Sequence, residues 1–160
     1  MQEFTVNGLA IDSTNQSPVV LLKELDGDRV LPVWIGPAEA DAIAIRLAEV
    51  DTPRPLTHDL LKRVIDGAGL RLQRVIISEI RQQTFYAELV LEGEGRILKI
   101  DARPSDSIAL ALRTGAPIFI SDELFQEEFG VDPAEDPERG DRLRQRLERI
   151  DPEEFGDLSL

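Results

Sequence analysis

The stretch that decides the fold is residues 101–113, Asp101-Ala102-Arg103-Pro104-Ser105-Asp106-Ser107-Ile108-Ala109-Leu110-Ala111-Leu112-Arg113. Its second half is apolar on every side, so we expect a helix buried at the centre of the domain. In its first half, Ser105 is the expected N-cap, and the charge of Asp106 suits the positive end of the helix dipole. The stretch therefore predicts a rigid polar junction between an incoming strand and a buried helix.

Outward from this junction, short apolar runs separated by turn residues predict a sheet. We expect strands at residues 3–12, 19–22, 30–35, 70–81, 84–91, 96–102 and 117–120, and helices at residues 37–50, 57–68 and 105–114. Pro32 places its strand at an edge or bulge of that sheet. The pattern indicates an α+β fold, with a mixed or antiparallel sheet of six or seven strands and three main helices.

The two halves of this pattern resemble one another. Each has about three strands followed by a helix, and Asp41-Ala42-Ile43-Ala44-Ile45 aligns with Asp106-Ser107-Ile108-Ala109-Leu110. Three of these five positions are identical, but such positions accept few residue types. The match can therefore arise by chance or from an internal β-β-β-α duplication.

The composition predicts a cytoplasmic protein without a membrane segment. Apolar residues make up 42% of the 160 residues, enough to build a core without a structural metal. There is no cysteine, which excludes disulfides and thiolate zinc sites. The first residues lack the pattern of a secretory signal, and no apolar run approaches the roughly 20 residues of a membrane helix.

The net charge of −13 is unevenly spread. Residues 121–160 hold 14 of the 31 acidic residues but only 5 of the 18 basic ones, and three Asp-Pro pairs interrupt them. We therefore divide the chain into a domain at 1–130 and an acidic extension at 131–160. In that extension Leu143, Leu147 and Ile150 predict a short amphipathic helix, either docked on the domain or used for interaction. The acidic balance weighs against a non-specific nucleic-acid binder but leaves room for an enzyme with a local basic groove.

His58, the only histidine, starts the second expected helix beside Asp59. A structural role, capping or hydrogen-bonded to Asp59, is one interpretation. The other is a general base or metal ligand that Asp59 orients.

Charged residues gather at the other helix starts. Asp101 and Asp106 could bind a hard divalent cation, and Arg103 could face a phosphate or pair with an acid nearby. Glu39 lies at the start of the first helix, and Arg54 is a stiffly held cation between two prolines. No zinc spacing, Walker loop, GxSxG elbow or GxGxxG turn is present.

Four blocks of this chain, in order, resemble the bifunctional nuclease domain family: residues 31–40, 53–61, 84–87 and 101–118. The likeness extends over about residues 1–125, and Ser107 stands where the family pattern has Ala. The resemblance implies an α+β fold, self-association and activity on DNA and RNA.

Two functions from different classes remain open. The first is a nuclease that uses Mg²⁺ or Mn²⁺ to hydrolyse phosphodiesters of a nucleic acid substrate. Its candidate metal ligands are Glu39, Asp59, Asp101 and Asp106, its catalytic residues are His58, Asp59, Asp101 and Asp106, and its phosphate contacts are Arg54 and Arg103. The second is a non-catalytic homo-oligomeric module, favoured as a dimer, whose polar blocks are structural ion-pair networks. We expect the dimer to form near the strand of Pro32 and Trp34.

Overall fold

One mixed sheet carries the fold of the described residues, 1–124 and 150–151, in a computed structural model. Seven strands follow the order β3-β2-β1-β7-β4-β5-β6, and the short strand β8 pairs with β1. Among the strand pairs of the described residues, β4–β7 is the parallel one. The strands are β1 (Gln2–Asp12), β2 (Ser17–Glu24), β3 (Val30–Trp34), β4 (Arg71–Arg81), β5 (Thr84–Gly93), β6 (Arg96–Ala102), β7 (Ile118–Ile120) and β8 (Ile150–Asp151).

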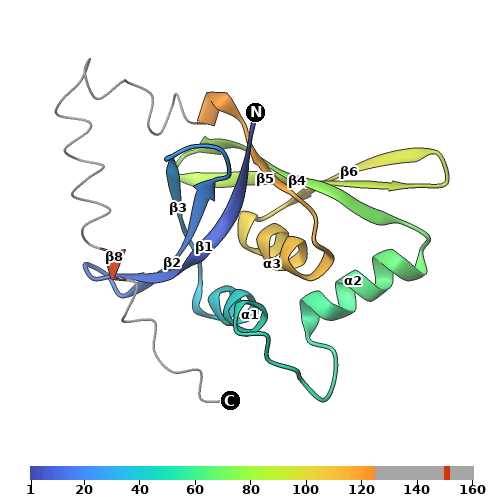
Figure 1. The fold of residues 1–160 in the computed structure, drawn as a ribbon, viewed down its shortest axis with the longest axis horizontal. Helices are drawn as coiled ribbons and strands as arrows, with labels where there is room; N and C mark the ends of the chain where they lie inside the picture. Colours follow the sequence, from blue (N-terminus) through green and yellow to red (C-terminus); the bar gives the residue numbers. More distant parts are fainter. Residues whose placement is uncertain (125–149, 152–160) are drawn as a thin grey trace.

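Three helices gather on one side of this sheet: α1 (Pro37–Leu47), α2 (Thr57–Gly67) and α3 (Pro104–Thr114) (Figure 1). The helix α3 contacts both other helices as well as β4 and β5. Ile108, Ala109 and Leu110 are fully buried, because their helix has neighbours all round. The α+β fold and the buried central helix are thus confirmed.

The topology has the form that a β-β-β-α duplication would produce. The units β1-β2-β3-α1 and β4-β5-β6-α3 lie on opposite sides of β7, which is antiparallel to β1 and parallel to β4. Both helices have 11 residues and begin with proline, at Pro37 and Pro104. Matching these prolines shifts the sequence alignment by two positions, so that Glu39 corresponds to Asp106, and Arg46 to Arg113.

Two helix starts differ from the sequence prediction. Ser105 is not the N-cap of α3; Arg103 is, because Pro104 takes the first helical position, where its missing N–H costs nothing. Thr57 is likewise the first helical residue of α2, after the N-cap Leu56. There Asp59 accepts a hydrogen bond from the Leu56 backbone N–H at 2.9 Å, which satisfies a donor at the helix start.

The acidic extension falls almost entirely outside the described residues. Leu143 and Leu147 lie there, whereas Ile150 belongs to β8 and is paired with Asp12. No helix in the described part of the chain is long and apolar enough to cross a membrane.

Candidate active site

Four polar side chains meet at the starts of α1, α2 and α3 and form what we call the Arg103 cluster: Glu39, His58, Arg103 and Asp106. The Asp106 carboxylate lies 2.9 Å from His58 Nε2 through Oδ1, and 2.7 Å from Arg103 Nε through Oδ2. Arg103 Nη2 donates to Asp106 Oδ1 at 3.1 Å, and Nη1 donates to Glu39 Oε1 at 2.8 Å. The cluster thus joins α1, α2 and α3, and it brings together Glu39, His58, Arg103 and Asp106 but not the candidates Asp59 and Asp101.

The electrostatics of the cluster keep Asp106 ionised. Burial alone would raise the pKa of Asp106, but hydrogen bonds from Arg103 and His58 outweigh burial and hold that pKa below its ordinary value. The bond to Asp106, and after it the bond to Glu39, raises the pKa of Arg103. The Arg103 guanidinium therefore lies between the carboxylates of Asp106 and Glu39. The His58 imidazole contacts Oδ1 of Asp106.

Solvent reaches the members of the cluster unequally. The Arg103 side chain is 64% exposed, whereas that of His58 is 12% exposed. A guanidinium has five N–H donors, and the bonds to Asp106 and Glu39 engage three of them. Two donors of Arg103 are left for a ligand outside the protein, and a guanidinium is a residue type suited to phosphate.

Asp59 is not the orienting partner of His58. Its Oδ1 accepts from Arg113 Nε at 2.6 Å, in a second network that we call the Arg113 cluster: Asp59 and Arg113 with the carbonyls of Ala42 and Ala109. The Arg113 side chain is only 4% exposed. Burial opposes ionisation of Asp59, but the Leu56 N–H and Arg113 outweigh it and lower the pKa of that carboxyl.

Asp101 and Arg54 lie apart from both clusters. In β6, Ala102 and Ile100 are opposite Ala87 and Leu89, which are buried on the helix side of the sheet. Side chains alternate along a strand, so Asp101 points to the opposite side of the sheet, whereas Arg103 has left the sheet as the N-cap of α3. Arg54 is exposed in the loop before α2, where only its backbone oxygen accepts a hydrogen bond, from Thr52.

The predicted metal ligands do not form one ligand set. Glu39 and Asp106 share Arg103, so a cation between them would have to displace a guanidinium. Asp59 is held by Arg113. Among the described residues, no group of three or more Asp, Glu or His side chains could hold a metal ion. As arranged, the donors do not fit the Mg²⁺ or Mn²⁺ site that the sequence predicted.

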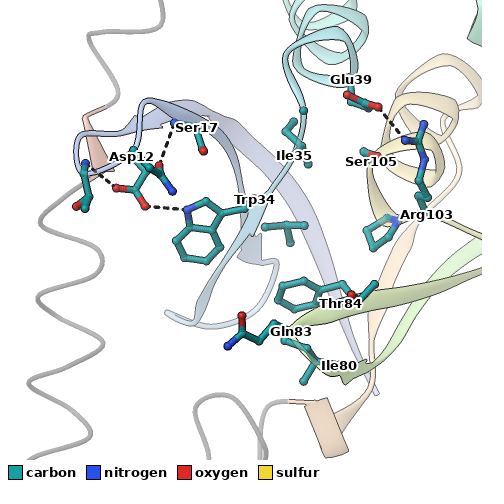
Figure 2. A pocket seen from close by; sticks show the side chains of 16 residues that line it. Asp12, Ser17, Trp34, Ile35, Glu39, Ile80, Gln83, Thr84, Arg103 and Ser105 are labelled. Carbon is teal, nitrogen blue, oxygen red and sulfur yellow. Dashed lines mark hydrogen bonds and ion pairs between the residues drawn. The ribbon is translucent and has the colours of Figure 1, made fainter.

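A pocket of about 880 Å³ borders the Arg103 cluster. Figure 2 shows Arg103 and Glu39 at one end of it and Trp34 at the other. The Trp34 indole N–H donates to Asp12 at 2.9 Å, which holds the ring in place. Phe85, Ser105 and the end of the β4–β5 hairpin complete the wall. The pocket therefore offers aromatic surface at one end and a guanidinium at the other.

Sequence reasoning missed Arg113 and the pocket residues Trp34, Phe85 and Ser105. Arg113 carried a usable signal, because it is the one charged residue near the end of an apolar helix. Trp34 and Phe85 carried none beyond their residue type, since strand aromatics are ordinarily core.

Comparison with known proteins points to one family. A model of the bifunctional nuclease domain matches residues 20–131. An uncharacterized protein of Mycobacterium tuberculosis (strain ATCC 25618 / H37Rv) is 38% identical over 164 residues, which cover 97% of this chain and 98% of that protein.

The plant proteins among the similar sequences are more distant and longer. Bifunctional nuclease 2 of Oryza sativa subsp. japonica is 28% identical over 121 residues, covering 73% of this chain and 37% of the rice protein. Bifunctional nuclease 1 of Arabidopsis thaliana is 26% identical over 111 residues, covering 67% of this chain and 34% of the plant protein.

Proposed function

Because the chain belongs to the bifunctional nuclease domain family, we propose that it cleaves phosphodiester bonds of nucleic acid at the Arg103 cluster. The observation that carries this proposal is the pair of spare Arg103 donors, exposed beside a pocket and next to a His–Asp pair. A guanidinium in that position can hold a phosphate oxygen and offset charge that develops during attack. The names of the plant relatives support the same class of reaction.

His58 is the candidate general base in this proposal. If its Nε2–H donates to Asp106, the lone pair on Nδ1 is left to accept a proton from the attacking water. Asp106 would hold the ring in that tautomer and stabilise the imidazolium that forms, as carboxylates do in other His–Asp pairs. Asp106 and Glu39 would also orient the Arg103 guanidinium, because both accept hydrogen bonds from it.

The pocket favours a single-stranded substrate. Its volume of about 880 Å³ lies within the range of small-ligand pockets, so it can take a nucleotide unit but not a duplex. An unpaired base can stack on Trp34 or Phe85 while its phosphate reaches Arg103, and stacking of this kind is sequence-tolerant. Because few cations line the pocket, binding should depend only weakly on salt, with about one phosphate neutralised.

The experiment compares variants on labelled single-stranded DNA, single-stranded RNA and duplex. His58→Gln should slow cleavage by about 100-fold or more, the usual contribution of a general base. Arg54→Ala, which removes an exposed cation outside the cluster, is the matched control and should cleave normally. Equal rates for the wild type and His58→Gln would contradict the proposal.

Each assay is run with EDTA, with Mg²⁺ and with Mn²⁺. Activity that persists in EDTA is expected from the cluster as arranged. Loss of activity in EDTA would instead indicate that the reaction requires a metal ion. That ion would have to displace Arg103 from Asp106 and Glu39.

A non-catalytic module is the second candidate, and one observation favours it. Every member of the Arg103 cluster already has a protein partner, as in a purely structural network. Asp106→Asn separates the two roles. A catalytic cluster predicts lost cleavage with nearly unchanged thermal stability, whereas a structural network predicts a clear loss of stability.

A further inference from the structure

The hairpin that joins β4 to β5 has glutamines where its backbone favours smaller residues. Arg81 pairs with Thr84, so Gln82 and Gln83 form a two-residue turn. Both glutamines have a positive φ, at 49° and 63°. Turns of this kind usually carry Asn or Asp followed by Gly, because a side chain is strained at a positive φ. Gln83 thus occupies the position that glycine usually takes.

The next hairpin of the same chain has the usual residue at that position. Between β5 and β6, Glu94 and Gly95 form a turn of the same length, with φ values of 49° and 71°. The two turns share their length and the sign of φ, but the second residue is glycine in one and glutamine in the other. Gln83 borders the pocket of about 880 Å³, whereas Gly95 does not. Strain kept beside a pocket points to a role for the strained residue.

The side chain of Gln83 is open to a ligand in this pocket. Its neighbour Gln82 does not border the pocket, although it belongs to the same turn. In Figure 2 the Gln83 amide extends toward the Trp34 side of the pocket. Gln83 is exposed, and no hydrogen bond within the described part of the chain uses its amide. That amide therefore offers two N–H donors and one acceptor oxygen.

The paired strands of the hairpin hold the turn in place. Arg81 forms an ion pair with Glu79 at 2.7 Å, and its guanidinium carbon lies 5.5 Å from the centre of the Tyr86 ring. The strand β4 also has a bulge between Ile77 and Glu79, which bends and twists the hairpin. Because the turn has only two residues on this paired stem, the backbone position of Gln83 is well defined.

We propose that Gln83 recognises the base of the substrate: its amide hydrogen-bonds the edge of an unpaired base in the pocket while Arg103 holds the phosphate. This inference rests on the proposed function, since it names a contact by which the same pocket selects its substrate. Every unpaired base presents a hydrogen-bond donor beside an acceptor on its pairing edge, and an amide can match them in either order by rotating. In a duplex that edge is occupied. Gln83 therefore favours single strands without selecting one base.

This role explains why the turn keeps a glutamine. Glycine at position 83 would relax the turn but would have no group to offer a base. A residue that binds substrate at the expense of stability should gain stability and lose binding when it is replaced by glycine. A glutamine without a role should gain the same stability and leave binding unchanged.

The test measures the affinity of the full chain for two short single-stranded oligonucleotides by fluorescence anisotropy. One carries bases and the other is abasic at every position, and both have phosphorothioate linkages, which keep the charge and resist cleavage. The wild type should prefer the oligonucleotide with bases. Gln83→Met keeps the length of the side chain but has no amide, so it should reduce this preference about tenfold, the effect of one or two hydrogen bonds. Its affinity for the abasic oligonucleotide should not change.

Gln83→Gly should lose the same preference while its midpoint of thermal unfolding rises by about 3 °C, because glycine relieves the strain. Gln82→Gly is the matched control in the same turn, and it should bind both oligonucleotides as the wild type does. Loss of the preference in Gln82→Gly as well would assign the effect to the shape of the turn and overturn the proposal.

Two further results would overturn the assignment of Gln83. One is a wild type that binds both oligonucleotides equally, and the other is a Gln83→Met variant that keeps the full preference for bases. Neither result depends on cleavage. They are therefore distinct from equal cleavage by the wild type and His58→Gln, which contradicts the proposed function.

Discussion

The two ends of α3 hold the same kind of contact in opposite surroundings. At its start, Arg103 lies between Asp106 and Glu39 with a side chain that is 64% exposed. At its end, Arg113 binds Asp59 and two backbone carbonyls with a side chain that is 4% exposed. Both arginines join α1, α2 and α3, directly or through their partners. The residue types alone do not distinguish a candidate binding site from a structural ion-pair network. The two differ in whether the arginine has N–H donors exposed to solvent.

The difference has a physical cause. Arg113 is buried, and its three hydrogen bonds satisfy carbonyls of α1 and α3 and the carboxylate at the start of α2. A cation near the C-terminal end of α3 also suits the helix dipole. The Arg103 side chain is exposed to solvent, so its ion pairs are weak in net energy and its remaining donors are open to a ligand.

The largest expected effect is on stability. Arg113→Ala should lower the free energy of unfolding by about 3 kcal/mol, because it leaves a carboxylate and two carbonyls without their donor. Arg103→Ala should lower it by less than about 1 kcal/mol, because solvent replaces its contacts. Urea unfolding of both variants measures the comparison. If Arg103→Ala and Arg113→Ala lower the free energy of unfolding by similar amounts, the Arg103 cluster also stabilises the fold.

A second, smaller effect is the dependence of stability on pH. Asp59 and Asp106 both have a pKa below the ordinary value of about 4. A carboxyl with a depressed pKa in the folded state stabilises the protein above its unfolded pKa, and that contribution is lost as pH falls through the folded value. Asp59→Asn should therefore be much less stable than the wild type at neutral pH, and the gap should narrow below about pH 4.

The two clusters should differ in this measurement too. The difference in stability between Asp106→Asn and the wild type should be smaller at neutral pH than that for Asp59→Asn, because the partner Arg103 is exposed to solvent. Asp41→Asn, at an exposed acid of α1 outside both clusters, is the matched control for the substitution itself. A gap for Asp59→Asn that stays constant from neutral to acid pH would exclude ionisation as the source of the stabilisation.

The smallest effect is expected from deletion of residues 131–160. Neither cluster uses a residue beyond Arg113, so both should persist in the shortened chain. The deletion removes β8, which pairs with β1 only at Ile11 and Asp12. A cooperative thermal melt with a slightly lower midpoint is the expected result. An insoluble or molten product would show that the extension completes the core.

Local patterns in the sequence determined most of the secondary structure. The strands β4, β5 and β6 begin and end within two residues of the predicted limits, because alternation and turn residues act over neighbouring positions. The burial of α3 also followed from sequence, since a helix that is apolar on every side must be covered. His58 and Asp106 were also candidates from sequence, as members of a catalytic set with Asp59 and Asp101, and packing brought His58 and Asp106 together.

The tertiary structure alone decided which charges pair. His58 and Asp59 are neighbours in the chain, yet a helix directs adjacent side chains about 100° apart, so His58 reaches Asp106 and Asp59 reaches Arg113. Asp101 is two residues from Arg103, yet it is still paired with Glu88 in the sheet, whereas Arg103 has left the sheet as the N-cap of α3. Such pairs depend on how distant elements pack, and one sequence carries no local signal of that packing. Composition and local pattern determined the elements, whereas packing around α3 decided which arginine is buried and which is open to a ligand.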